Sequence, residues 1–147
     1  PEDVTVIGIE NMENFRLIRQ QRSFFETYLK TRRLPTKVLF VSRYPQSVDL
    51  RKWLMSIPNH YLHFGDFDLA GIKIFLSEFQ EFIGSERSSY LIPDDIEYRL
   101  NSGSRKRYDE LFRHFNEVKS NNSELQRLID LIHNERKAYD QEGYIGE

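Results

Sequence analysis

Short runs of apolar, β-forming residues alternate with amphipathic segments from residue 4 to residue 92. Each apolar run is too short for a helix and ends at turn-forming or charged residues, which predicts strands over 4–9, 38–41, 61–64 and 90–92. The intervening segments repeat their apolar residues at helical spacing, which predicts helices over 14–29, 47–55 and 69–83. This order predicts an α/β fold: a Rossmann-like, doubly wound parallel sheet of four strands with helices on both faces.

The same periodicity predicts which helical side chains face the core. In the helix over 47–55, we expect Val48, Trp53 and Leu54 to point inward. The helix over 69–83 should bury either Phe82 or Ile83 at its end and stop at the glycine that follows.

In the last third of the sequence we expect helices over 96–100, 105–118 and 123 to about 140, with apolar stripes, separated by loops at 101–104 and 120–122. Ser123 and Gln126 stand at the spacing of a capping box. At 147 residues the chain has the size of one ordinary domain. We therefore expect a core over 1–95 and a helical extension over 96–147 packed on the same domain.

Composition and charge exclude several classes of protein. Hydrophobic residues make up 39% of the chain and aromatic residues 14%, which favours a folded domain over a disordered one. The formal net charge of −2 provides no global field toward a polyanion, so any nucleic acid must be held locally. Cysteine is absent, which excludes disulfides and thiolate chemistry and suits the reducing cytoplasm.

Membrane association is not expected, because no apolar run approaches the roughly 20 residues that span a bilayer and no signal-peptide pattern opens the chain. The first residue is Pro1 rather than Met. We therefore expect the chain to be a piece of a longer protein.

Two aspartates follow the third apolar run, after Gly65. In a chain that leaves a strand still extended, residues i and i+2 point to the same side, so Asp66 and Asp68 should share one space, with Phe67 turned away. Two adjacent carboxylates need a positive partner, and oxygen-only ligands favour Mg²⁺ or Mn²⁺. The pair alone is also compatible with a solvated turn in which Asp68 caps the next helix.

A third carboxylate, Glu10, follows the first apolar run. Ligands of doubly wound sheets bind at the carboxyl ends of the strands, where the strand order reverses. If the first and third strands are neighbours, Glu10 converges with Asp66 and Asp68 on one rim. Carboxylates packed in this way would raise one another's pKa in the absence of a metal. Three carboxylates from two separated segments favour a metal site over helix caps.

Local positive charge for a phosphate has two main candidates. Arg43 follows the second apolar run and so falls on the same rim, and Lys73 lies in the first turn after the aspartates, although it is equally compatible with a solvated helix face. The basic clusters at 30–33 and 105–107 are weaker candidates for contacts with a DNA backbone. His60 and His63, beside and within the third strand, are expected to be packed and hydrogen-bonded rather than metal ligands.

These residues together resemble a Toprim domain, the metal-dependent catalytic module of topoisomerases, primases and several nucleases. That family has a Glu at the end of its first strand and Asp-x-Asp at the end of its third, which Glu10 and Asp66-Phe-Asp68 match. Segments 9–15 and 64–74 are similar to the Toprim part of the DNA-cleaving subunit of Wadjet plasmid-defence systems, itself related to the topoisomerase VI A subunit. The resemblance covers residues 4 to about 92 well and the remainder loosely.

The resemblance implies a Toprim catalytic domain that cleaves DNA phosphodiesters. Asp66 and Asp68 would bind one or two Mg²⁺ or Mn²⁺ ions, and Glu10 would be a third metal ligand or the general acid/base. Glu142, in a stretch similar to a Gln-Glu signature of that subunit, would serve a second metal, unless it is simply an exposed tail residue. The implied partners are DNA and an SMC-like ATPase complex, and a homodimer is left open.

Three alternatives stay open. The relatives carry a winged-helix DNA-binding domain before the Toprim part, and in topoisomerase VI it holds a nucleophilic tyrosine, so strand cleavage could depend on a tyrosine from a region preceding this chain. A non-catalytic Toprim-like binding or assembly module is the second. A small-molecule phosphotransfer enzyme is the third, but it would show a Gly-rich loop where this chain has the acidic segment 10–14.

Overall fold

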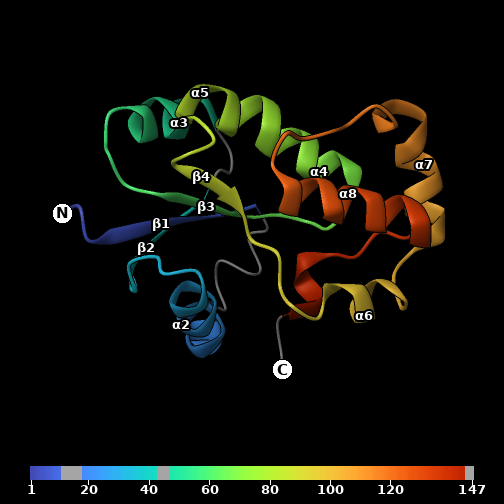
Figure 1. Ribbon diagram of the computed structural model, residues 1–147, viewed down its shortest axis with the longest axis horizontal. Helices are drawn as coiled ribbons and strands as arrows, with labels where there is room; N and C mark the ends of the chain where they lie inside the picture. The colour runs from blue at the N-terminus through green and yellow to red at the C-terminus, as the bar shows by residue number, and fades with distance from the viewer. Residues whose placement is uncertain (11–17, 43–46, 145–147) are drawn as a thin grey trace.

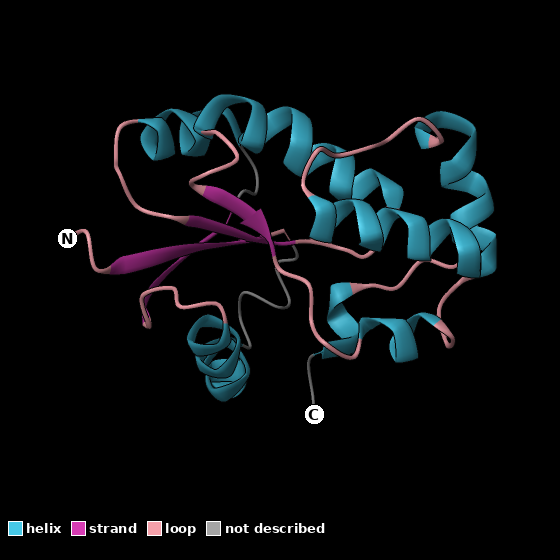
Figure 2. Ribbon diagram, viewed as in Figure 1, coloured by secondary structure: helices cyan, strands magenta, loops and turns pink. Residues whose placement is uncertain are grey.

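The computed structural model describes residues 1–10, 18–42 and 47–144. Within these residues, parallel strands form one four-stranded sheet in the order β2-β1-β3-β4 (Figures 1 and 2). The strands are β1 (Val4–Ile9), β2 (Lys37–Ser42), β3 (Tyr61–Phe64) and β4 (Ser88–Tyr90). The predicted α/β class and four-stranded parallel sheet are confirmed.

The strand order reverses between β1 and β3. From β1 the chain crosses to β2 on one side, and β3 then pairs with β1 on the other. Gly8 aligns with His63 and Ile9 with Phe64, so the two strands end side by side. The segments that leave these strands therefore start from the same point on the rim, where ligands of such sheets bind.

Helices cover both faces of the sheet (Figure 2). One face carries α2 (Arg22–Thr31), which a 3₁₀ turn precedes at Ile18–Gln21. The other carries α3 (Ser47–Met55) and one long helix, composed of α4 (Leu69–Ile74), the π-helical segment η2 (Phe75–Gln80) and α5 (Glu81–Ile83). The long helix matches the predicted span 69–83, although the sequence did not predict its π-helical part. Residues 14–17 of the predicted helix 14–29 lie outside the described residues.

The inward face of α3 differs from the prediction. Leu54 is 1% exposed, but Val48 is 46% and Trp53 40% exposed. Leu50 and Leu54, four residues apart, form the stripe that packs on the core, and this narrow stripe leaves the other side of a short helix to solvent. At the end of the long helix, Ile83 is buried and Phe82 is exposed.

The fourth strand lies two residues earlier than predicted. Pairing with β3 aligns Tyr61 with Ser88 and His63 with Tyr90, so the ladder ends before the apolar residues Leu91 and Ile92. Leu91 is nevertheless fully buried, and its N–H group donates to the carbonyl of His63. The apolar pattern therefore predicted the buried residues correctly, but not the residues that pair with β3.

The last third forms a helical extension beside the end of the sheet (Figure 1). It consists of α6 (Ile96–Leu100), α7 (Arg105–Phe115), α8 (Ser123–Glu135) and the 3₁₀ turn η3 (Gln141–Tyr144). The prediction that the last helix runs to residue 140 is wrong, because Arg136 takes a left-handed conformation with φ of 53° and turns the chain back.

The capping box predicted between Ser123 and Gln126 does not form, because α8 begins with an N-cap one residue earlier. Asn122, not Ser123, is the N-cap, and its side chain accepts from the N–H group of Leu125. The Gln126 side chain instead accepts from the N–H group of Ser120. Among the described residues, no helix is both long and apolar enough to cross a membrane.

Candidate metal centre

Asp66 and Asp68 lie in the segment that connects β3 to α4. Phe67 between them is fully buried, and its backbone pairs with Tyr139: each N–H group donates to the other residue's carbonyl, at 2.8 and 3.1 Å. Because the segment is extended, burying Phe67 turns both carboxylates to the opposite side, as the i, i+2 spacing predicts.

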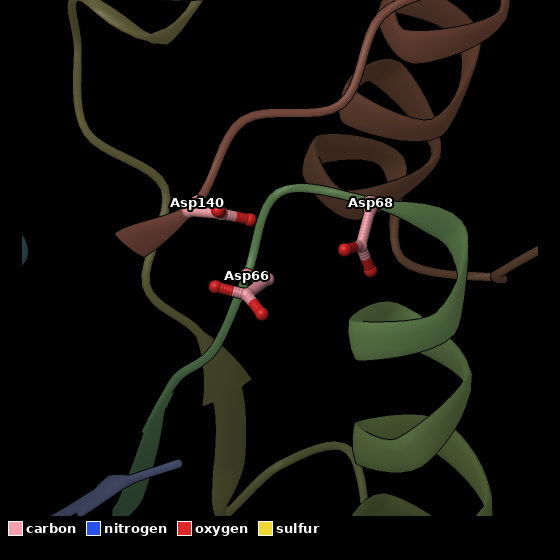
Figure 3. Close-up of side chains that lie close together, drawn as sticks. All are labelled: Asp66, Asp68 and Asp140. Carbon is pink, nitrogen blue, oxygen red and sulfur yellow. The ribbon is translucent and has the colours of Figure 1, made fainter. Parts of the chain in front are cut away.

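The pairing with Tyr139 brings in a third carboxylate, that of Asp140. Figure 3 shows Asp140 entering from the returning tail, while Asp66 and Asp68 come from the β3–α4 segment. Each of the three offers a carboxylate oxygen, and these oxygens lie within 4.8 Å of one another. The three residues therefore converge on one small space at the carboxyl end of β3.

Backbone N–H groups fix one oxygen of Asp66 and one of Asp68. Oδ1 of Asp68 accepts from Gly71 N–H at 2.6 Å and caps α4, and Oδ1 of Asp66 accepts from Gln141 N–H at 3.0 Å. The cap predicted as an alternative role for Asp68 is thus present, but it uses only one oxygen. Oδ2 of each aspartate is left for the shared space.

Arg107 of α7 contacts all three carboxylates. Its Nη2 atom lies 3.2 Å from Oδ2 of Asp66 and 2.9 Å from Oδ2 of Asp68, and its Nη1 atom pairs with Oδ1 of Asp140. Oδ2 of Asp68 is buried and accepts no hydrogen bond from the described residues, so its contact with Arg107 is electrostatic only. One guanidinium therefore forms ion pairs with three carboxylates, but it donates no hydrogen bond to Asp68.

The electrostatics of the cluster disfavour the ionised aspartates. Burial raises the pKa of Asp66 to about 6, and the neighbouring Asp68 and Asp140 add to this, while Gln141 N–H and Arg107 oppose it. Burial also raises the pKa of Asp68 above its usual range, against the opposing effects of Gly71 N–H and Arg107. A bound cation would lower these raised pKa values, because its positive charge stabilises the ionised carboxylates.

Glu10 lies beside this cluster but is engaged elsewhere. Its Oε1 atom is 2.5 Å from Nε2 of His63, whose Nδ1 atom is 2.7 Å from the hydroxyl of Tyr61. His63 and Tyr61 are fully buried, whereas the Glu10 side chain keeps 10% exposure. The prediction that His63 is packed and hydrogen-bonded is confirmed. Glu10 still adds to the raised pKa of Asp68, after the larger effect of burial, so the two carboxylates sense each other.

The other predicted site residues are not among the three aspartates that converge. Lys73 is exposed on α4 and lines a different groove, beside the α7–α8 connection. Glu142 is exposed in η3 and lines a cavity of about 450 Å³ that Arg107 and Asp140 also line. Arg43 lies outside the described residues.

Sequence reasoning missed Asp140 and Arg107 as site residues. In the sequence, Asp140 stands two residues before Glu142, and Arg107 belongs to the basic cluster at 105–107. Both reach the aspartates through contacts between distant segments, 41 residues apart for Arg107 and Asp66. The sequence shows that the two residues are a carboxylate and a cation, but no local sequence pattern places them beside Asp66 and Asp68.

Over residues 2–146 the chain matches a family described as a domain of unknown function (DUF7281), and it belongs to that family. No curated protein matches the chain. No solved structure matches it either.

Proposed function

We propose that this DUF7281 member is a metal-dependent, Toprim-like catalytic domain that cleaves DNA phosphodiester bonds. The observation that carries the proposal is the convergence of Asp66, Asp68 and Asp140, with oxygens within 4.8 Å of one another, where the strand order reverses. The resemblance of Glu10 and the Asp-x-Asp pair to the Toprim pattern supplies the reaction class.

The donor set fits a hard divalent cation. All three candidate ligands are carboxylates, the oxygen donors that Mg²⁺ and Mn²⁺ prefer. Oδ2 of Asp68 is a buried acceptor without a hydrogen bond, a cost that its 2.9 Å ion contact with Arg107 offsets only in part and that a bound cation would relieve. Asp66, Asp68 and Asp140 would hold the ion, and Glu142, which lines the adjacent cavity, is a candidate for a second one.

A bound ion would supply charge neutralisation at the scissile phosphate and at the attacking and leaving oxygens. Glu10 would act as the general acid/base, taking the proton of the attacking water or returning one to the leaving oxygen. His63 would orient Glu10 through its Nε2 contact, and Tyr61 would fix the ring through Nδ1.

DNA as the substrate, a place in a Wadjet-like plasmid-defence system and an SMC-like ATPase complex as partner follow from the resemblance. On this proposal the chain works in the cytoplasm, and DNA is positioned largely by a separate DNA-binding region. Arg43 and Lys73 remain candidates for phosphate contacts.

A second function is favoured by the contacts of Arg107. Its ion pairs with three aspartates join α7, the tail and the β3–α4 segment, which is also what a structural clasp in a non-catalytic module would do. The two functions predict opposite effects of the Asp66 charge on the stability of the metal-free fold. In a clasp that charge stabilises the metal-free fold, whereas in a metal site it destabilises the fold until a metal binds.

The Asp66→Asn variant separates the two, because asparagine keeps the Oδ1 acceptor and removes the charge. For a metal site we expect the variant to raise the free energy of unfolding in EDTA at pH 7. The gain is at most about 3 kcal/mol, the equivalent of a pKa raised from 3.8 to about 6. The variant should also lose Mn²⁺ and Mg²⁺ binding in calorimetry and the nicking of supercoiled plasmid. Urea unfolding measures the stability.

Metal binding by the wild-type chain that Asp66→Asn abolishes, together with a stabilised metal-free fold, supports the metal site, and nicking lost in the same variant supports the nuclease. Absence of metal binding in the wild-type chain, with a destabilised variant, would establish the clasp instead. Binding without nicking would reject autonomous cleavage by this chain. Lys52→Gln, an exposed charge change on α3, is the control and should leave all three measurements unchanged.

A further inference from the structure

The contacts within the acidic cluster divide into fixed and exchangeable ones. Oδ1 of Asp66 and Oδ1 of Asp68 are held by backbone N–H groups, which do not leave. The oxygens that face the shared space, Oδ2 of both residues and Oδ1 of Asp140, contact the same guanidinium. Arg107 therefore occupies the point on which the three candidate metal ligands converge.

The position of Arg107 allows it to leave. Its side chain is 37% exposed and extends from α7, near the N-terminus that Ser104 caps. It lines the cavity of about 450 Å³ that Asp140 also lines, so the side chain has open space beside it. A long side chain on a fixed helix can exchange positions by rotamer changes without moving the backbone.

The net charge of the cluster favours a cation with a higher charge than that of Arg107. Three carboxylates surround a single positive charge, so two negative charges stay uncompensated there. The guanidinium also leaves Oδ2 of Asp68 without a hydrogen bond. A divalent ion would bring twice the charge to the same oxygens.

We propose that Arg107 is an internal cation that holds the three aspartates together in the metal-free chain, competes with the metal for them, and on displacement becomes a contact for the substrate phosphate. This inference rests on the proposed metal site. It gives Arg107 two roles: to hold the aspartates in place while no metal is bound, and to bind the substrate phosphate afterwards. The planar guanidinium, with its fork of N–H donors, is suited to binding a phosphate.

The test compares Arg107→Gln with Lys106→Gln, which removes the same charge from the neighbouring, exposed position of α7. If Arg107 occupies the site about 90% of the time, its removal should lower the Kd for Mn²⁺ by about tenfold, because apparent affinity scales with the fraction of competent sites. Lys106→Gln should shift the Kd by less than about twofold, since exposed charges are screened. Mn²⁺ binding is followed by electron paramagnetic resonance and calorimetry.

Arg107→Gln should also nick plasmid more slowly at saturating Mn²⁺, with the fold verified by circular dichroism. Arg107→Lys, which keeps the charge, guards against misfolding and should retain a Kd close to that of the wild type. A Kd that is unchanged or raised in Arg107→Gln, while the wild-type chain binds Mn²⁺, overturns the competition. Nicking that is unaffected overturns the phosphate contact. If the wild-type chain binds Mn²⁺ but cuts no DNA, the nuclease proposal fails alone, and the change in Kd still decides the competition.

Discussion

The carboxylate of Glu10 is held differently from those of the three aspartates. It contacts the buried imidazole of His63 at 2.5 Å, and it is not among the carboxylates whose oxygens gather within 4.8 Å. The resemblance to Toprim domains left two roles for this residue, a third metal ligand or a general acid/base. Because Oε1 is engaged by His63 and Glu10 is outside the group of three, we expect the second role.

The Glu10→Gln variant tests this at the residue scale. We expect its Kd for Mn²⁺ to stay within about threefold of the wild type while plasmid nicking falls by about 100-fold or more, the usual contribution of a general acid/base. His63→Gln should show the same separation with a smaller loss, because the carboxylate stays but is less well oriented. Calorimetry and nicking rates on the same samples provide both values. Loss of Mn²⁺ binding comparable to that of Asp66→Asn would make Glu10 a ligand.

At the scale of elements, the start of α4 is packed unusually closely against the site. A Cβ atom at Gly71 would stand 2.6 Å from the carbonyl oxygen of Asp66 and 3.1 Å from the hydroxyl of Tyr90. That hydroxyl donates to the same carbonyl oxygen, so neither neighbour can retreat easily. A glycine at this position lets the first turn of α4 lie directly against the segment that carries the aspartates.

We therefore expect Gly71→Ala to destabilise the fold by about 2 kcal/mol, despite the better helix propensity of alanine, because the clash with backbone outweighs about 1 kcal/mol of propensity. Mn²⁺ binding should weaken in parallel, since Asp66 would have to shift. Urea unfolding and calorimetry measure both. Lys73→Ala, two residues further on and exposed, is the matched control. A Gly71→Ala variant as stable as that control would contradict the close packing.

The elements themselves were largely predictable from local pattern. β1, β3, α3 and α6 lie at the predicted residues, because apolar runs and helical stripes are properties of the segments alone. The end of α8 and the register of β4 were not predictable in this way. Arg136 turns the chain where no glycine or proline marks it, and β4 is defined by its pairing with β3 rather than by its own apolar residues.

At the scale of the whole molecule, the site joins the sheet to the helical extension. Asp66 and Asp68 belong to the β3–α4 connection and follow from a strand pattern, so the sequence predicted them. Asp140 and Arg107 come from the tail and α7, and only the pairing of Phe67 with Tyr139 and the packing of α7 against α4 place them there. Long-range contacts of this kind leave no periodicity in a single sequence.

Away from the site, Tyr28 of α2 is tied to the segment that follows β4 and leads into the extension, because its hydroxyl accepts from the N–H group of Ile92 at 3.1 Å. Burial raises the pKa of Tyr28 from 10.0 to about 12, against the opposing effects of Ile92 N–H and Arg32. The folded state therefore disfavours the phenolate, and the stability that this group contributes is complete below pH 10 and declines as the pH rises through 12. The decline in the free energy of unfolding amounts to about 3 kcal/mol.

Tyr28→Phe should lower the free energy of unfolding by about 1 kcal/mol at pH 7, because the hydrogen bond is lost. In urea unfolding, its stability should also decline less steeply between pH 9 and pH 11. Parallel curves for the two proteins would show that the phenol titrates as it does in the unfolded chain.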